Sequence, residues 1–254
     1  MNGTVVVTGG GSGIGRAICQ ELAKETWRVI VTDIRLDAAE ETRASLSGQG
    51  HEAAALNVTD SEAANALADD ISSRFGLDAW VSNAGVSKMQ RFVDVAETDY
   101  DFTLGINLKG VFLCGQAAAR VMIAQGRGGK IVNTASMAGK QGRVPFLADY
   151  VASKFGVVGL TQAMAFELAS SNITVNAVCP GFVATPMQDR ELAWEAELKG
   201  TSVDDVRQSW VSDTPLGRLQ EPSDVADVVG FLLSKKADFL TGESISANGG
   251  AYMD

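Results

Sequence analysis

The sequence predicts an α/β fold in which a doubly wound, parallel sheet of about seven strands carries helices on both faces. Short β-branched runs alternate with helical patterns as far as about residue 180, which is typical of repeated βαβ units. A glycine-rich turn links the first of these runs to the first helical pattern. Parallel strands need right-handed crossovers, and these place helices on both faces of the sheet.

The strands are predicted from short apolar runs bounded by turn residues. In chain order these runs are Thr4–Thr8, Arg28–Asp33, Glu52–Asn57, Asp78–Ser82, Lys130–Ala135, Thr174–Val178 and Ser244–Ala247. Helical patterns fill the gaps. Ser61–Phe75, for example, places its larger apolar side chains on one face, with Asp60 or Ser61 as its cap. Neither a linker nor an internal repeat divides the 254 residues, so residues 1–254 are predicted to form one domain.

Composition excludes several classes of function. A formal net charge of −10 argues against nucleic acid as a partner, because phosphate binding needs clustered Lys and Arg. The apolar runs are too short to span a membrane, and no signal peptide precedes the first strand, so a cytoplasmic enzyme is expected. Cys19, Cys114 and Cys179 are odd in number and far apart, which fits reduced thiols. With His51 as the one histidine, we expect no metal site and no Ser-His-Asp triad.

The glycine-rich turn Thr8–Gly15 predicts a dinucleotide site. Glycines let the backbone approach a pyrophosphate, and the start of the following helix favours its negative charge. Asp33 ends the second strand about 20 residues later, where a carboxylate accepts hydrogen bonds from ribose hydroxyls and repels a 2′-phosphate. Ser12 adds no positive charge to the turn. These features predict a Rossmann fold that binds NAD, although Arg35 leaves NADP open.

In the order in which they occur, the motifs resemble those of the short-chain dehydrogenase/reductase family over nearly the whole chain. They are Thr8–Gly15, Asn57–Asp60, Ser82–Gly85, Asn107, Ser136, Tyr150–Lys154 and Pro180–Gly181. The resemblance implies that Asn57 and Val58 flank the adenine, that residues 83–85 lie beside the cofactor ribose, and that Val183 and Thr185 contact the nicotinamide. The cofactor-binding residues expected are therefore Gly9, Ser12, Gly13, Ile14, Gly15, Asp33, Ile34, Asn57, Val58, Asn83, Ala84, Gly85, Tyr150, Lys154, Pro180, Gly181, Val183 and Thr185.

The chain departs from the family pattern at three places. Asn57 and Asn248 stand where Asp is commoner, and Asn57 keeps one acceptor oxygen for the adenine. The segment between Ser136 and Tyr150 is slightly long, so the course of residues 140–145 is left unassigned.

Tyr150 and Lys154 are separated by one turn of a predicted helix, so their polar ends share a face. A nearby ammonium favours the phenolate form of tyrosine, and Tyr150 would then exchange the hydroxyl proton while a hydride moves between the carbinol carbon and nicotinamide. Ser136 follows a predicted strand and would orient the substrate oxygen. The resemblance implies that Asn107 holds a relay water and that Lys154 also binds the ribose. Singly, each residue has a purely structural explanation; together they predict catalysis.

Residues 186–215 are predicted to form a helical flap over the site, and Trp194 and Trp210 either contact the substrate or only pack the flap. The layout resembles that of family members acting on small diols and sugar alcohols, of the sorbitol and acetoin types. A 3-oxoacyl-carrier-protein reductase is the alternative enzyme, against which the acidic charge counts. A non-catalytic NAD sensor is the alternative from another class.

A homotetramer is expected from two helical stretches, residues 107–122 and 151–168, which are unusually apolar for surface crossovers. They carry Val111, Phe112, Val157, Val158, Leu160, Met164 and Phe166. The resemblance implies that this helix pair forms the subunit interface.

Overall fold

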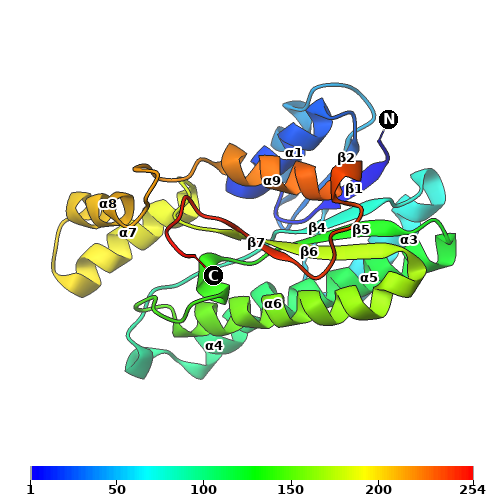
Figure 1. The fold of residues 1–254 in the computed structure, drawn as a ribbon. Coiled ribbons are helices and arrows are strands. Elements are labelled where there is room, and N and C mark those ends of the chain that lie inside the picture. The colour runs from blue at the N-terminus through cyan, green and yellow to red at the C-terminus, as the bar shows by residue number, and fades with distance from the viewer. Residues whose placement is uncertain (1, 254) are drawn as a thin grey trace.

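The computed structural model describes residues 2–253 and contains a seven-stranded parallel sheet of order β3-β2-β1-β4-β5-β6-β7. The predicted fold class is therefore confirmed (Figure 1). The strands are β1 Thr4–Val7, β2 Arg28–Asp33, β3 Glu52–Ala55, β4 Ala79–Ser82, β5 Gly129–Thr134, β6 Ile173–Pro180 and β7 Ser244–Ala247. From β1 the strands are added on one side as far as β3, and β4 then begins the other half of the sheet beside β1. A ligand is expected at the carboxyl ends of β1 and β4, where the strand order switches.

The helices are α1 Gly13–Lys24, α2 Leu36–Ala44, α3 Ser61–Phe75, α4 Glu97–Leu104, α5 Gly110–Gln125, α6 Ala148–Leu168, α7 Pro186–Lys199, α8 Val203–Ser212 and α9 Pro222–Leu233. A π-helical turn, Gly105–Lys109, joins α4 to α5. The predicted helix Ser61–Phe75 has the observed bounds. Of its two predicted caps the structure uses Asp60, whose carboxylate accepts hydrogen bonds from the amides of Glu62 and Ala63.

Several predicted strands are shorter in the structure. Thr8, Asn57 and Ala135 lie just beyond the observed ends, because the chain turns there toward the carboxyl edge of the sheet. β6 is instead longer than the predicted Thr174–Val178, because it pairs with β5 along one side and β7 along the other. The errors at the carboxyl ends thus fall at the sheet edge that the site occupies, whereas β4, β5 and β6 differ from the prediction by one residue at their other ends.

Alternate side chains of the strands pack against different helical layers. Val5 and Val7 of β1 belong to one buried cluster with α1 and α9, whereas Val6 belongs to another with α3 and α5. Figure 1 shows α1 and α9 on one side of the sheet and α3, α5 and α6 on the other. Both faces of the strands are therefore covered, as strands of continuous apolar sequence require.

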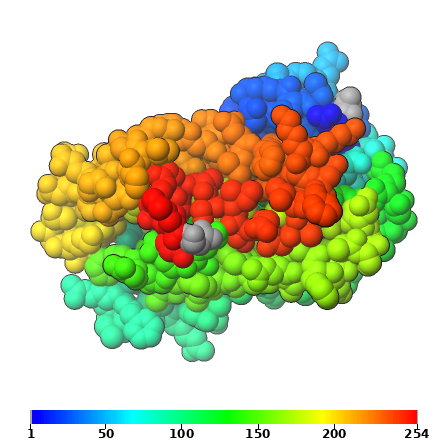
Figure 2. Space-filling model, viewed as in Figure 1, coloured from blue at the N-terminus to red at the C-terminus, as the bar shows by residue number. Residues whose placement is uncertain are grey.

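The predicted flap consists of α7 and α8, which project from the body of the molecule (Figures 1 and 2). Thr185 caps α7 by accepting a hydrogen bond from the amide of Gln188, and Ser202 with Asp205 forms a capping box at α8. The two helices share a small apolar core that includes Leu192, Ala196, Val206 and Trp210. This part of the chain is thus a separately packed helical pair.

The apolar side chains of α5 and α6 fall into a buried set and an exposed set. Val111 and Val157 pack within the molecule, so their prediction as association surface is wrong. Phe112, Phe155 and Phe166 are exposed, Phe166 at 91%. Only part of the predicted apolar surface is therefore free to meet a partner. Among the helices of residues 2–253, none has the length and hydropathy needed to cross a membrane.

Candidate active site

The turn after β1 brings the backbone unusually close to its neighbours. A Cβ on Gly15 would lie 2.0 Å from the carbonyl oxygen of Gly9, and Gly9 itself adopts a φ of +63° against Ala84. Within residues 2–253, the Ser12 side chain makes no capping hydrogen bond, which leaves amide groups at the start of α1 free for an anion. This cradle fits a pyrophosphate.

Hydrogen bonds join the carboxyl ends of β1, β4 and β5. The Thr8 hydroxyl accepts from the amides of Asn83 and Ala84 at 2.9 and 3.1 Å. The Asn83 side chain donates to the carbonyls of Thr8 and Gly9 and accepts from the Thr134 hydroxyl at 3.3 Å. Three strand ends are therefore fixed relative to one another.

Asp33 lies at the end of β2, as predicted, and its carboxylate accepts hydrogen bonds from the amides of Gly11 and Arg35, each at 3.1 Å. Arg16, a possible partner for a 2′-phosphate, is occupied elsewhere. Its guanidinium donates to the Gly11 carbonyl at 2.6 Å and to the Thr42 hydroxyl at 2.9 Å. The acidic group thus lines the cavity, while the Arg16 guanidinium is hydrogen-bonded to the protein itself.

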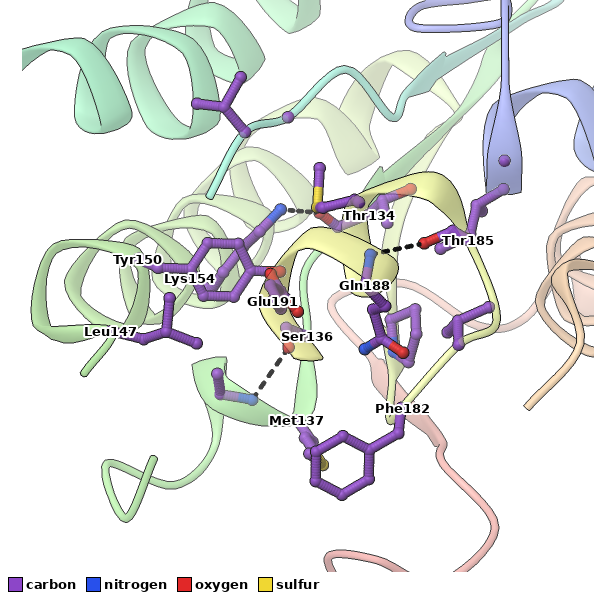
Figure 3. A pocket seen from close by; sticks show the side chains of 18 of the residues that line it. Thr134, Ser136, Met137, Leu147, Tyr150, Lys154, Phe182, Thr185, Gln188 and Glu191 are labelled. Carbon is purple, nitrogen blue, oxygen red and sulfur yellow. Dashed lines mark hydrogen bonds between the residues drawn. The ribbon is translucent and has the colours of Figure 1, made fainter. Parts of the chain in front are cut away.

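Ser136, Tyr150 and Lys154 meet beside the end of β5 (Figure 3). Ser136 begins a short 3-10 turn and accepts a hydrogen bond from the Ala138 amide at 3.1 Å. Tyr150 and Lys154 lie one turn apart on α6, and the Lys154 ammonium nitrogen is 5.5 Å from the centre of the Tyr150 ring. The same nitrogen donates to the Thr134 carbonyl at 2.8 Å.

Burial dominates the electrostatics of this pair. It raises the pKa of Tyr150, to which the Glu191 carboxylate adds, while a hydrogen bond with Ser136 lowers it. Burial also lowers the pKa of Lys154 to about 8. Desolvation thus disfavours the charged form of both groups, and the prediction that Lys154 favours the phenolate stays a prediction.

Asn107 lies outside the cavity that the other predicted site residues line. It sits in the π-helical turn, fully buried, and its amide group holds both the amide and the carbonyl of Val86 at 2.8 and 2.9 Å. Its nitrogen also donates to the Ser153 hydroxyl at 3.2 Å. Asn107 thus fixes the chain that follows β4, and a water-holding role remains a prediction.

One cavity of about 700 Å³ gathers the other predicted residues. It is lined by Gly9, Ser12, Gly13, Ile14, Gly15, Asp33, Ile34, Asn57, Val58, Asn83, Ala84, Gly85, Ser136, Tyr150, Lys154, Pro180, Gly181, Val183 and Thr185. Residues of the unassigned loop 140–145 also line it, namely Gln141, Arg143, Val144 and Pro145. The dinucleotide turn and the Tyr150 region are therefore parts of one site.

Among residues 2–253, no three His, Cys, Asp or Glu side chains are grouped as a metal site would need.

The sequence analysis missed Gln188 and Glu191 of α7, which also line the cavity. A signal was present: Glu191 and Glu195 flank the buried Leu192 and Ala196, so they lie on the inward stripe of the helix.

The two flap tryptophans have different surroundings. Trp210 lines the cavity, stacks on Phe182 with ring centres 4.9 Å apart, and donates from its indole nitrogen to Glu195 at 3.1 Å. Trp194 is half-buried and does not line the cavity. Of the two, Trp210 is therefore the one available to a substrate.

The chain is similar to known proteins along its full length. A family model described as enoyl-(acyl carrier protein) reductase matches residues 9–252. The 3-oxoacyl-(acyl-carrier-protein) reductase FabG of Staphylococcus aureus (strain Mu50) is 38% identical over 257 residues, covering 100% of this chain and 99% of that protein. The (3R)-3-hydroxyacyl-CoA dehydrogenase of Homo sapiens is 38% identical, covering 98% and 95%. The crystal structure of a short-chain type dehydrogenase/reductase from Mycobacterium marinum has a TM-score of 0.88 and 32% identity, covering 98% and 95%.

The lowered pKa of Lys154 predicts that this residue destabilises the protein. Below pH 8 the lysine is protonated in both states, and the folded state bears the desolvation cost; between pH 8 and 10.5 the unfolded chain binds more protons, so stability rises with pH. We expect Lys154→Met to raise the free energy of unfolding at pH 7 by roughly 2 kcal/mol, with a smaller gain at pH 10, in urea denaturation without cofactor. The exposed Lys235→Met is the control; an equal effect of both variants would contradict the prediction.

Proposed function

The chain belongs to the short-chain dehydrogenase/reductase family, and from this premise we propose that it transfers a hydride between NAD(H) and a secondary alcohol or ketone at the Tyr150 end of its cavity. It is an oxidoreductase acting on CH–OH or keto groups, as are its relatives. The observation that carries the proposal is the single cavity that joins the glycine turn to Ser136, Tyr150 and Lys154. A non-catalytic sensor would not need that set.

In the oxidative direction, Tyr150 takes the proton of the substrate hydroxyl, and in the reductive direction it returns that proton to the carbonyl oxygen. Ser136, which is hydrogen-bonded to Tyr150, holds the same substrate oxygen. Burial lowers the pKa of Lys154 to about 8, and the Thr134 carbonyl fixes its ammonium group, so Lys154 is suited to pass a proton onward. When bound, nicotinamide accepts or supplies the hydride. Asn107 positions Val86 at the cavity wall.

We propose NAD over NADP because of Asp33. Its carboxylate lies in the cavity wall next to the glycine turn, where it can accept hydrogen bonds from ribose hydroxyls and would repel a 2′-phosphate. Arg16 is engaged by Gly11 and Thr42, which leaves Arg35 as the nearest cation for a phosphate.

For the substrate, the relatives favour the alternative prediction over the small polyol or diol. Both curated relatives named above act, by their names, on 3-oxoacyl or 3-hydroxyacyl thioesters, and both match this chain along its length. The apolar wall made by Met89, Met137 and Phe182 suits an acyl chain. A small diol or sugar alcohol stays the second candidate, favoured by the polar groups of Gln188 and Glu191 in the same cavity.

We also propose a homotetramer in a reducing, cytoplasmic setting. Exposed aromatic side chains on α5 and α6, including Phe112 and Phe155, support association. Cys19, Cys114 and Cys179 are buried, and within residues 2–253 no disulfide joins them, which suits a reducing compartment.

Replacing Tyr150 with phenylalanine removes the proposed proton donor and little else. We expect kcat to fall at least about 100-fold, because general acid–base catalysis is lost. NADH absorbance with 3-hydroxybutyryl-CoA and with 2,3-butanediol measures turnover and compares the two substrate classes. Titration of the cofactor should give nearly unchanged binding. Tyr100→Phe, outside the cavity, should retain activity; equal activity of Tyr150→Phe would refute the assigned role.

Asp33→Ser tests the cofactor preference. The variant loses charged hydrogen bonds to the ribose worth about 1.5–3 kcal/mol, so kcat/KM for NAD should fall roughly 10- to 100-fold. The value for NADP should rise, because the repulsion is gone. Asp37→Ser makes the same change of charge on α2. An unchanged NAD to NADP ratio in Asp33→Ser would count against the proposal.

Light scattering at micromolar concentration is expected to give four times the 26.6 kDa mass of one chain. Phe112→Asp together with Phe155→Asp should yield smaller species, because charges in an apolar interface are costly. Phe92→Asp places the same charge on another exposed aromatic position and should leave the assembly intact. A monomeric unmodified protein would contradict the prediction.

A further inference from the structure

Helix α7 brings a carboxylate into the cavity beside the proposed proton donor. Glu191 is 8% exposed, and Figure 3 shows it and Tyr150 pointing toward one another. Its Oε1 accepts a hydrogen bond of 2.5 Å from the hydroxyl of Ser87, in the chain that follows β4. Within residues 2–253 no cation forms an ion pair with it. A carboxylate offers about four acceptor positions, so most of its capacity faces the cavity unused.

Gln188, one turn earlier on α7, carries a second polar group with unused hydrogen-bonding capacity. Its side-chain oxygen is buried and, within residues 2–253, has no hydrogen-bond partner. Residues three apart on a helix share a face, and both side chains line the cavity. A buried polar group without a partner is costly, so a bound molecule that supplies the missing hydrogen bond gains affinity.

Glu195 provides a comparison within the same helix. This buried carboxylate is satisfied by the protein itself, because it accepts from the indole nitrogen of Trp210 and pairs with Lys199. Its role is to hold α7 against α8. The protein thus completes the bonding of one carboxylate and leaves the other with a single hydroxyl partner.

We propose that Glu191, held by Ser87, is a specificity-determining residue that recognises a second oxygen of the substrate, one or two carbons from the reacting carbon. The inference rests on the proposed function, since Tyr150 must hold the first oxygen. Two sources share this chemistry: the neighbouring hydroxyl of a diol or hydroxyketone, and the thioester carbonyl of a 3-oxoacyl group. An ionised Glu191 accepts from the hydroxyl, and a protonated Glu191 donates to the carbonyl.

Both forms of Glu191 are available near neutral pH. The pKa of Glu191 is raised to about 7, mainly by burial and to a lesser extent by Glu195, against the lowering effects of the Ser87 hydrogen bond and Arg190. Tyr150 faces it from α6 and is coupled to it electrostatically. A preference for a second hydroxyl should therefore grow as pH rises through 7, and a preference for a second carbonyl should grow as pH falls.

The test compares reduction of 2-butanone, which has one oxygen, with that of 3-hydroxy-2-butanone and acetoacetyl-CoA. In the unmodified enzyme, kcat/KM for at least one two-oxygen substrate should exceed that for 2-butanone by about tenfold or more. Glu191→Leu should reduce this ratio about tenfold or more, and Ser87→Ala should reduce it less. Glu191→Gln should keep much of the ratio but lose its dependence on pH, because an amide does not titrate. The direction of the pH dependence identifies the source of the second oxygen.

Glu197→Gln, at an exposed position of α7 outside the cavity, is the matched control and should leave the rates on all three substrates unchanged. The inference is overturned if the ratio is unaltered in Glu191→Leu, or if all three rates fall together as they would for a structural role. If Tyr150→Phe loses turnover but the substrate ratio is unchanged in Glu191→Leu, this inference alone is wrong. If Tyr150→Phe retains turnover, the proposed function on which the inference rests is wrong.

Discussion

The hydrogen bonds of the Thr8 hydroxyl are the constraint on which the site depends. One oxygen receives the amides of Asn83 and Ala84, and Asn83 reaches back to β1 and across to β5. Parallel strands offer no tight connection between their carboxyl ends, so side chains must join them. The glycine turn, the chain after β4 and the start of the Ser136 segment are consequently held as one wall of the cavity.

Burial is the largest influence on the ionisable side chains of that wall. Burial alone moves the pKa values of Tyr150 and Lys154 toward their neutral forms, which overrides the attraction expected from their separation by one helical turn. Glu191 responds in the same direction. The protonation of these groups thus depends on how deeply each one is buried, which cannot be deduced from sequence spacing.

The sequence sufficed for the sheet, the glycine turn and most of the cavity lining, because periodicity and glycine placement are local properties of the chain. It did not predict which side chains are buried or exposed when this depends on how distant parts of the chain pack together. Val111 and Phe112 are adjacent and equally apolar, yet one faces the sheet and the other the solvent. Glu191 resembles any surface carboxylate until α7 is folded over the site. Asn107 belongs to one of the family motifs, but its side chain bonds to the backbone of Val86 and to Ser153.

The π-helical turn Gly105–Lys109 links two surfaces of the molecule. Its backbone spacing is wider by one residue than that of an α-helix, and the Gly110 amide bonds to the Gly105 carbonyl. Each residue of a regular helix advances by about 100°, so removing one position here would swing every later side chain of α5 by that angle relative to α4. Asn107 behind the cavity and Phe112 on the exposed face of α5 therefore keep their present orientations only together. A change in chain length at this turn would alter both the cavity wall and that exposed face.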